Sequence, residues 1–166
     1  MILFLDFDGV LHPEPCTKKE LFQSLHLVEA ILRDFPRVEI VVSSAWRLDY
    51  KYEHECVPQM RKHFSSDIAP RVIGVTPDHR YDDGDKAPAG LGAFQRHWEC
   101  DAWLRAHRPP GTPWLALDDR EWWFEPSCPN LMEFDCTIGF TEEHSDELRR
   151  RLRDMERAFT TGAAAS

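Results

Sequence analysis

The sequence has no long apolar segment and no excess of positive charge. Its first apolar run, Ile2–Leu5, ends at Asp6, so it cannot form the core of a signal peptide, and no other run approaches membrane-spanning length. The formal net charge of −9 argues against tight, sequence-independent binding of nucleic acid, because such binding requires basic side chains that replace counterions. We therefore expect a cytoplasmic protein without a membrane partner. The charge still suits a site in which carboxylates surround a divalent cation.

Paired cysteines are also missing. The five cysteines are an odd number and include no C-x-x-C pair. The histidines and cysteines show no spacing typical of a zinc site. This pattern favours reduced thiols in a cytosolic protein over a disulfide framework or a structural zinc ion.

The length and composition indicate one globular domain. The chain has 166 residues, of which 42% are hydrophobic and 30% are charged, and a domain of this size can bury a core without disulfides. We expect the domain to span residues 1–159 and the small, polar tail at 160–166 to be disordered. The sequence shows no internal repeat and indicates no oligomeric state.

Short apolar runs alternate with helical patterns along the chain. Strands are expected over residues 1–5, 38–42, 71–76, 114–117 and 131–134. Helices are expected over residues 21–35, 57–64, 94–104 and 141–159. The third helix would bury a stripe of Phe94, Trp98 and Ala102. Strands that alternate with helices predict an α/β fold, a three-layer sandwich with a mainly parallel five-stranded sheet.

Polar residues with useful chemistry follow three of these strands. Asp6 and Asp8 come after the first strand, Ser43-Ser44 after the second, and Asp118-Asp119 after the fourth. Ligands of open α/β sheets bind at the carboxyl ends of the strands. The coincidence predicts one active site at that edge.

The Asp6-Phe7-Asp8-Gly9 segment carries the strongest signal. A carboxylate can attack phosphorus to form an aspartyl phosphate, and a second one can protonate the leaving oxygen and later deprotonate water. Gly9 permits the tight turn that aims both side chains. A solvated turn is the simpler alternative, but the position directly after a buried apolar run argues against it.

The other strand ends would complete a phosphoryl-transfer site. The hydroxyl of Ser43 or Ser44 can donate to a phosphoryl oxygen, although an ordinary loop serine would look the same. Adjacent Asp118 and Asp119 repel each other at a buried strand end unless a cation joins them, and Mg²⁺ suits such hard oxygen ligands.

A basic side chain is also needed to offset the charge of the transferring phosphoryl group. We expect Arg96, on the third helix, to supply it. Lys86 is the alternative, although its place in the Asp-, Gly- and Pro-rich stretch at 77–92 also suits a solvated lysine.

The order of these motifs resembles that of haloacid dehalogenase (HAD)-like phosphatases. A closer resemblance is to the HAD domains associated with Swiss-army-knife RNA repair proteins. It rests on Asp8-Gly9-Val10-Leu11-His12, Ser43-Ser44-Ala45-Trp46-Arg47, Gly74-Val75-Thr76-Pro77, and Arg96 with Glu99, Trp103 and Leu104.

The resemblance implies a role for each carboxylate. Asp6 would be the nucleophile and a Mg²⁺ ligand, and Asp8 would be the general acid and base, with its backbone carbonyl as another ligand. Asp119 would be the main metal ligand of its pair, supported by Asp118.

The same resemblance implies that Ser43 binds the phosphoryl group, with Ser44 as the alternative, and that Arg96 stabilises its charge. The expected activity is therefore a Mg²⁺-dependent phosphatase that works through an aspartyl phosphate.

The span from residue 10 to residue 38 is too short for a large cap domain, and the stretch at 77–92 could form only a small flap. Uncapped members of this superfamily tend to act on macromolecules or accessible phosphates. The resemblance therefore points to a phosphate on a nucleic-acid end or a nucleotide.

Several residues near the strand ends could contact such a substrate. Trp46, Trp122 and Trp123 could stack on a base, or pack at the edge of the core. Arg47 could contact a substrate phosphate, or pair with an acidic side chain.

Other functional classes fit the sequence less well. A receiver-like signalling domain carries its acidic pair on the first strand and its phosphoacceptor on a later one, the reverse of this order. A non-catalytic phosphate-binding module would be expected to lose a carboxylate of the D-x-D motif. An acidic metal nuclease would need neither Ser43 nor Arg96.

Overall fold

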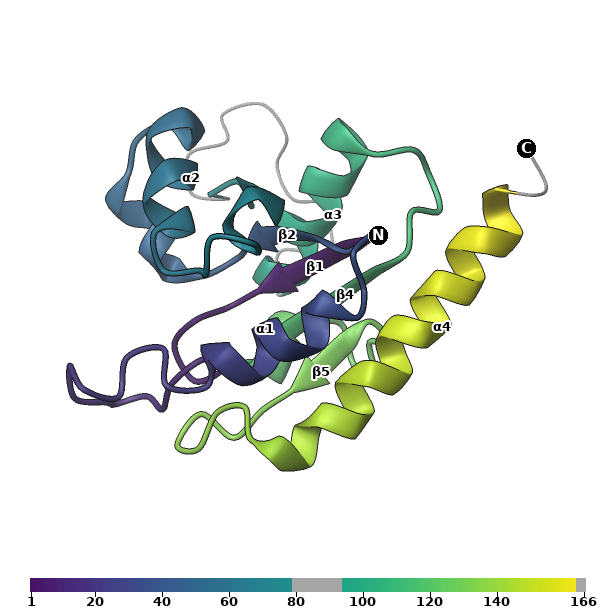
Figure 1. Cartoon of the computed structure of the whole chain (residues 1–166). Helices are drawn as coiled ribbons and strands as arrows, with labels where there is room; N and C mark the ends of the chain where they lie inside the picture. The colour runs from purple at the N-terminus through teal and green to yellow at the C-terminus, as the bar shows by residue number, and fades with distance from the viewer. Residues whose placement is uncertain (79–93, 164–166) are drawn as a thin grey trace.

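The computed structural model describes residues 1–78 and 94–163, which form a parallel sheet with helices on both faces (Figure 1). The five strands lie in the order β3-β2-β1-β4-β5, and every neighbouring pair is parallel. Their bounds are Ile2–Leu5 (β1), Glu39–Val42 (β2), Val72–Val75 (β3), Trp114–Asp118 (β4) and Leu131–Glu133 (β5). The predicted α/β fold with a five-stranded parallel sheet is confirmed.

The central strand β1 explains why its sequence is a continuous apolar run. All four of its side chains are fully buried, because helices cover both faces of the sheet. Leu3 and Leu5 belong to the core on one face, whereas Ile2 and Phe4 belong to the smaller core on the other. This alternation is the expected pleat of a strand.

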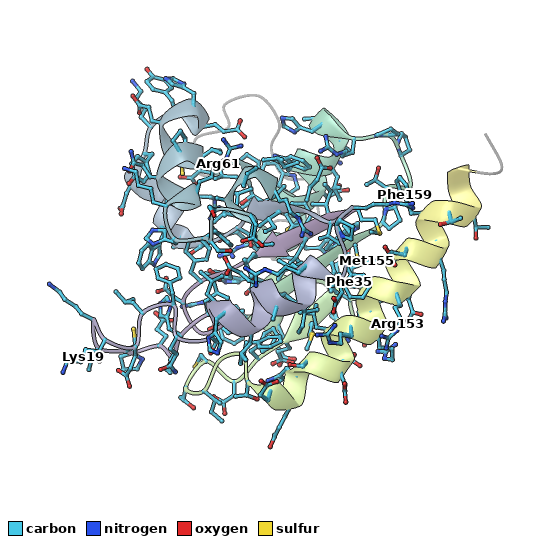
Figure 2. The ribbon with its side chains drawn as sticks, viewed as in Figure 1. Lys19, Phe35, Arg61, Arg153, Met155 and Phe159 are labelled. Atoms are coloured by element: carbon cyan, nitrogen blue, oxygen red, sulfur yellow. The ribbon has the colours of Figure 1, made fainter. Side chains whose placement is uncertain are left out.

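The helices divide between the two faces of the sheet. Their bounds are Leu25–Arg33 (α1), Glu53–Arg61 (α2), Gln95–His107 (α3) and Ser145–Ala163 (α4). Helices α1 and α4 cover the face of Leu3 and Leu5, and α3 covers the opposite face (Figure 1). Met155 lies on the inner side of α4 and exposed Arg153 on its outer side (Figure 2).

The predicted stripe of α3 was wrong. Phe94 and Ala102 are only partly buried, whereas Arg96, Trp98 and Glu99 are buried. The reason is that α3 turns two charged side chains inward, toward polar groups at the carboxyl ends of the strands. An apolar periodicity search cannot detect such a face.

Several helix boundaries also differ from the prediction, including those of α2, which spans Glu53–Arg61 and not residues 57–64. Helix α1 begins at Leu25 rather than near Leu21, since Phe22 has a φ of 59°, a left-handed conformation that a helix cannot contain. Helix α4 continues to Ala163, so part of the tail expected to be disordered is helical. Residues 164–166 lie outside the described residues.

The described residues contain no folded cap domain over the carboxyl edge of the sheet. Between β1 and β2 the chain forms turns and helix α1. Most of the expected loop at 77–92, including Lys86, falls within residues 79–93, which the structure does not describe. Among the described helices none is long and apolar enough to cross a membrane.

Candidate active site

The predicted strand ends meet at the carboxyl edge of the sheet. The backbone N–H of Asp6 donates to the carbonyl of Leu117 at 3.0 Å, and that of Ser43 donates to the carbonyl of Leu5 at 3.0 Å. Strands β2, β1 and β4 are neighbours in the sheet and end side by side. Asp6, Ser43 and Asp118 therefore lie together at the carboxyl edge.

Three carboxylates form a buried cluster at this edge. Asp6, Asp118 and Asp119 each offer an oxygen, and these oxygens lie within 4.8 Å of one another. Oδ1 of Asp119 is buried, and no hydrogen-bond partner for it lies in the part of the chain that the structure describes. Gly9, with a φ of +70°, lies so close that an added Cβ would be 2.6 Å from the Asp119 carboxyl group. Hard oxygens at this spacing fit a divalent cation such as Mg²⁺.

The electrostatics of the cluster also favour a bound cation. Burial raises the pKa of Asp118 to about 7, against the attraction of Arg96. Burial, with the nearby charge of Asp6, raises the pKa of Asp119 to about 6. The raised pKa values mean that ionised carboxylates are unfavourable in this buried cluster. A divalent cation would stabilise their ionised forms.

Arg96, which the sequence analysis expected to offset the charge of a phosphoryl group, contacts two carboxylates of this cluster. Its Nη1 donates to Oδ2 of Asp6 at 3.1 Å and to Oδ2 of Asp118 at 2.9 Å. The other oxygen of Asp118 accepts the backbone N–H of Arg120 at 3.0 Å. Both oxygens of Asp118 are therefore bonded, whereas Asp119 keeps an unbonded oxygen.

Asp8 faces a different set of partners from those of Asp6. Its carboxylate accepts hydrogen bonds from Nε1 of Trp46, at 2.9 and 3.1 Å, and lies 3.0 Å from Nε2 of His12. Nδ1 of fully buried His12 accepts the backbone N–H of Phe22 at 3.3 Å, so Nε2 carries the proton and donates to Asp8.

These two donors hold a carboxylate that remains partly open to solvent. The Asp8 side chain is 33% exposed. Burial raises its pKa, but the hydrogen bonds from His12 and Trp46 outweigh burial and hold the pKa below its ordinary value. The sequence analysis assigned no role to His12. The D-G-V-L-H spacing could have suggested one, because it returns a histidine to Asp8 after a tight turn.

Trp46 takes the packing position expected as the alternative to base stacking. Its ring packs edge-on against Phe7, Phe22 and His63, with centroids 5.9, 5.2 and 5.4 Å away. The ring is therefore anchored in an aromatic cluster while its N–H is directed at Asp8.

The two serines after β2 differ in their bonding. Oγ of Ser44 accepts the backbone N–H of Trp46 at 3.4 Å and caps the short helix Ala45–Asp49 (η1). Oγ of Ser43 is buried and has no hydrogen-bond partner within residues 1–78 and 94–163. The free hydroxyl of Ser43 is thus the one available to a phosphoryl oxygen.

Arg47 pairs with an acidic side chain, the second of its two expected roles. Its Nη2 donates to Glu99 at 2.6 Å, and both residues are buried. Its other nitrogens donate to the carbonyls of Ser43, Ser44 and Thr76 at 2.7, 2.8 and 3.0 Å. The guanidinium therefore links the ends of β2 and β3 through hydrogen bonds.

A second arginine lies at the exposed rim of the cluster. Arg120 follows Asp119, and its guanidinium carbon is 4.7 Å from the ring of Trp123, while that of Arg96 is 5.2 Å away. Arg120 also pairs with Glu14 at 2.8 Å. Trp123 is only partly exposed, whereas Trp122 is 59% exposed. The sequence analysis did not single out Arg120.

A cavity of about 1230 Å³ lies beside this cluster, between η1, α2 and α3. Of the predicted site residues only Arg47 lines it, and its rim reaches Asp78, the last described residue before 79–93. The aspartates, not this cavity, define the candidate active site.

A comparison with known proteins identifies the family of the chain. The family model for the HAD domain in Swiss Army Knife RNA repair proteins matches residues 2–145, a span that includes every candidate site residue. No curated protein and no solved structure matches the chain. The match covers most of the chain, and the chain therefore belongs to the family of HAD domains found in Swiss Army Knife RNA repair proteins.

Proposed function

We propose that this HAD domain is a Mg²⁺-dependent phosphatase that forms an aspartyl phosphate on Asp6. The observation that carries the proposal is the division of carboxylates at one sheet edge. Asp6, Asp118 and Asp119 form a cluster that fits a cation, while Asp8 is held outside that cluster by Trp46 and His12.

The first chemical step uses Asp6 as the nucleophile. One oxygen of its carboxylate accepts the N–H of Phe7 at 2.7 Å and the other accepts Arg96 at 3.1 Å, which orients the group. A bond forms between an Asp6 oxygen and phosphorus while the bond from phosphorus to the leaving oxygen breaks. Asp8, in its protonated form, would donate the proton that the leaving oxygen needs.

The phosphoryl oxygens need partners during this transfer. Ser43 would donate its free hydroxyl, and Arg96 would contribute positive charge from within the cluster. When bound by Asp6, Asp119 and the backbone carbonyl of Asp8, Mg²⁺ supplies further positive charge to these oxygens.

The second step returns Asp6 to its carboxylate form. Asp8 would deprotonate the water that attacks phosphorus, and the bond between phosphorus and Asp6 breaks. The two hydrogen bonds to Asp8 favour its ionised form, which is the form that accepts a proton. We therefore expect Asp8 to contribute more to breakdown of the intermediate than to its formation.

The proposed substrate is a phosphate on a nucleic-acid end or a nucleotide. Two observations support it. No folded cap covers the aspartates among the described residues, and the family is named for RNA repair proteins. A site without a folded cap among the described residues can receive a terminal phosphate that is attached to a large group.

A phosphatase screen tests the proposal. The substrates are nitrophenyl phosphate, phosphosugars, nucleotides and oligonucleotides phosphorylated at the 3′ or 5′ end, with Mg²⁺ or with EDTA. We expect turnover that EDTA abolishes and added Mg²⁺ restores, and highest kcat/KM for a nucleotide or oligonucleotide phosphate. Full activity in metal-free buffer would refute the mechanism.

A further inference from the structure

Two arginines border the aspartate cluster, but only one of them is open to solvent. The side chain of Arg96 is 3% exposed, and its Nη1 is committed to Asp6 and Asp118. The side chain of Arg120 is 31% exposed. Of the two, Arg120 is therefore the guanidinium that an incoming substrate meets first.

The position of Arg120 is fixed close to the reacting groups. Its backbone N–H donates to Oδ1 of Asp118, and its Nε lies 3.8 Å from Oδ1 of Asp119. Its side chain rests on the ring of Trp123, which restricts the freedom of the arginine chain. A group bound by Arg120 would lie beside the phosphate on Asp6.

The present partner of Arg120 is one that a substrate can replace. Nη2 donates to Oε2 of Glu14 at 2.8 Å, and the Glu14 side chain is 45% exposed. Exposed ion pairs of this kind are weak in water. Phosphate oxygens match the fork of a guanidinium group as well as a carboxylate does, so a phosphate can take the place of Glu14.

The charge of the site also requires such a group. Asp6, Asp8, Asp118 and Asp119 would repel a substrate that carries more than one phosphate. Arg96 is shared with Asp6 and Asp118, so its charge offsets only part of this repulsion. A second cation at the rim offsets the repulsion where the rest of the substrate enters.

We propose that Arg120 exchanges Glu14 for a second phosphate of the substrate, adjacent to the phosphate that is removed. The site would therefore prefer a terminal phosphate followed by a phosphodiester, as in a phosphorylated dinucleotide, over an isolated monoester. This inference rests on the proposed phosphatase function and assigns Arg120 as a specificity-determining residue.

The kinetic test compares two substrates in three proteins. We would measure kcat/KM for a phosphorylated dinucleotide and for nitrophenyl phosphate in wild type, R120Q and E14Q. Loss of the charge-assisted contact in R120Q should lower the dinucleotide-to-nitrophenyl ratio about tenfold, mainly through KM. E14Q should raise the ratio, because it removes the competing carboxylate. A purely structural role for the pair would not move the ratio in opposite directions.

Arg108 provides a matched control at the opposite edge of the sheet. It pairs with Glu39 at 2.8 Å, is 26% exposed, and its guanidinium carbon is 5.3 Å from the ring of Trp103. R108Q therefore removes a similar ion pair and ring contact far from the aspartates, and it should keep the wild-type ratio. An unchanged ratio in R120Q, with Mg²⁺-dependent turnover intact, would overturn the inference and leave the proposed function standing.

A binding measurement keeps the inference independent of turnover. Calorimetry with D6N and with the D6N/R120Q double variant, in Mg²⁺, would use 3′- and 5′-phosphorylated dinucleotides, a nucleoside 3′,5′-bisphosphate and inorganic phosphate. We expect D6N to bind the ligands with two phosphates more tightly than inorganic phosphate. In D6N/R120Q the ratio of these two affinities should be about tenfold smaller. If only the nucleoside 3′,5′-bisphosphate bound tightly, the second phosphate that Arg120 contacts would be a monoester and not a phosphodiester. Equal binding of all ligands would overturn the inference.

Discussion

The carboxyl edge of the sheet has two sides, each built around a buried arginine. On the side of β1 and β4, Arg96 donates to the carboxylates of Asp6 and Asp118. On the side of β2 and β3, Arg47 donates to backbone carbonyls and to Glu99. The same residue type therefore lies among the carboxylates of the proposed active site on one side and holds the ends of the chain segments together on the other.

Breaking the chemical side should have the largest effect. D6N should lose turnover and any trapped acyl phosphate, because an amide cannot form that intermediate. D8N should lose about 10²–10⁴-fold in rate, the usual contribution of proton transfer. With nitrophenyl phosphate, which needs little protonation as it departs, D8N should show a burst of phenol followed by slow turnover. Rapid-quench kinetics measures both. A burst in D6N would place the nucleophile elsewhere.

Replacing each of the two arginines in turn tests the comparison directly. R47Q should lower the free energy of unfolding by about 3 kcal/mol, because it leaves Glu99 buried with a weaker partner and several carbonyls unpaired. R96Q should lose activity and also stability in metal-free buffer. Saturating Mg²⁺ should restore much of the stability of R96Q but not that of R47Q, since only Arg96 contacts carboxylates that a cation can join. Urea denaturation of each variant, with and without Mg²⁺, measures these free energies. If Mg²⁺ restored the stability of both variants equally, the two arginines would not differ in the way proposed.

The pKa values predict how the free energy of unfolding varies with pH. Asp118 and Asp119 have pKa values of about 7 and about 6 in the folded protein, above the ordinary value of 3.8. Between pH 4 and 7 the folded state thus binds more protons than the unfolded state, and stability falls as pH rises through that window.

In metal-free buffer we expect this loss of stability to appear as a Tm that is clearly lower at pH 8 than at pH 5. Mg²⁺ should raise Tm more at pH 8 than at pH 5, because it binds the ionised carboxylates. D118N should flatten the pH dependence. A slope in wild type that D118N does not change would assign the effect to other groups.

The smallest expected effect concerns the hydrogen bond from Trp46 to Asp8. W46F keeps the ring but removes the N–H, so kcat should fall about tenfold with little change in KM. The acidic limb of the pH profile should also move to higher pH, because a donor that lowers the pKa of Asp8 is gone. Trp103 is the matched control, since its buried N–H has no hydrogen-bond partner among the described residues, and W103F should leave both quantities unchanged. If the two variants behave alike, the Trp46 bond has no catalytic role.

Much of the fold and part of the site could be predicted from residue order. Continuous apolar runs can be recognised as buried strands, and the carboxyl ends of parallel strands share one edge. This is why residue order alone is enough to place Asp6, Ser43 and Asp118 together. The buried face of α3 was missed because Arg96 and Glu99 interrupt its apolar pattern, and their reason for being inside lies in other elements.

The sequence by itself determined which residues could take part in phosphoryl transfer and at which end of the sheet they would lie. The reason is that an apolar run and the polar residues that follow it can be recognised from the local sequence. Only the tertiary structure decided which partner each side chain takes. Trp46 on Asp8, Glu99 on Arg47, and Glu14 on Arg120 are contacts between separate turns and helices. Such pairings follow from how elements pack in space, and a single residue pattern does not encode them.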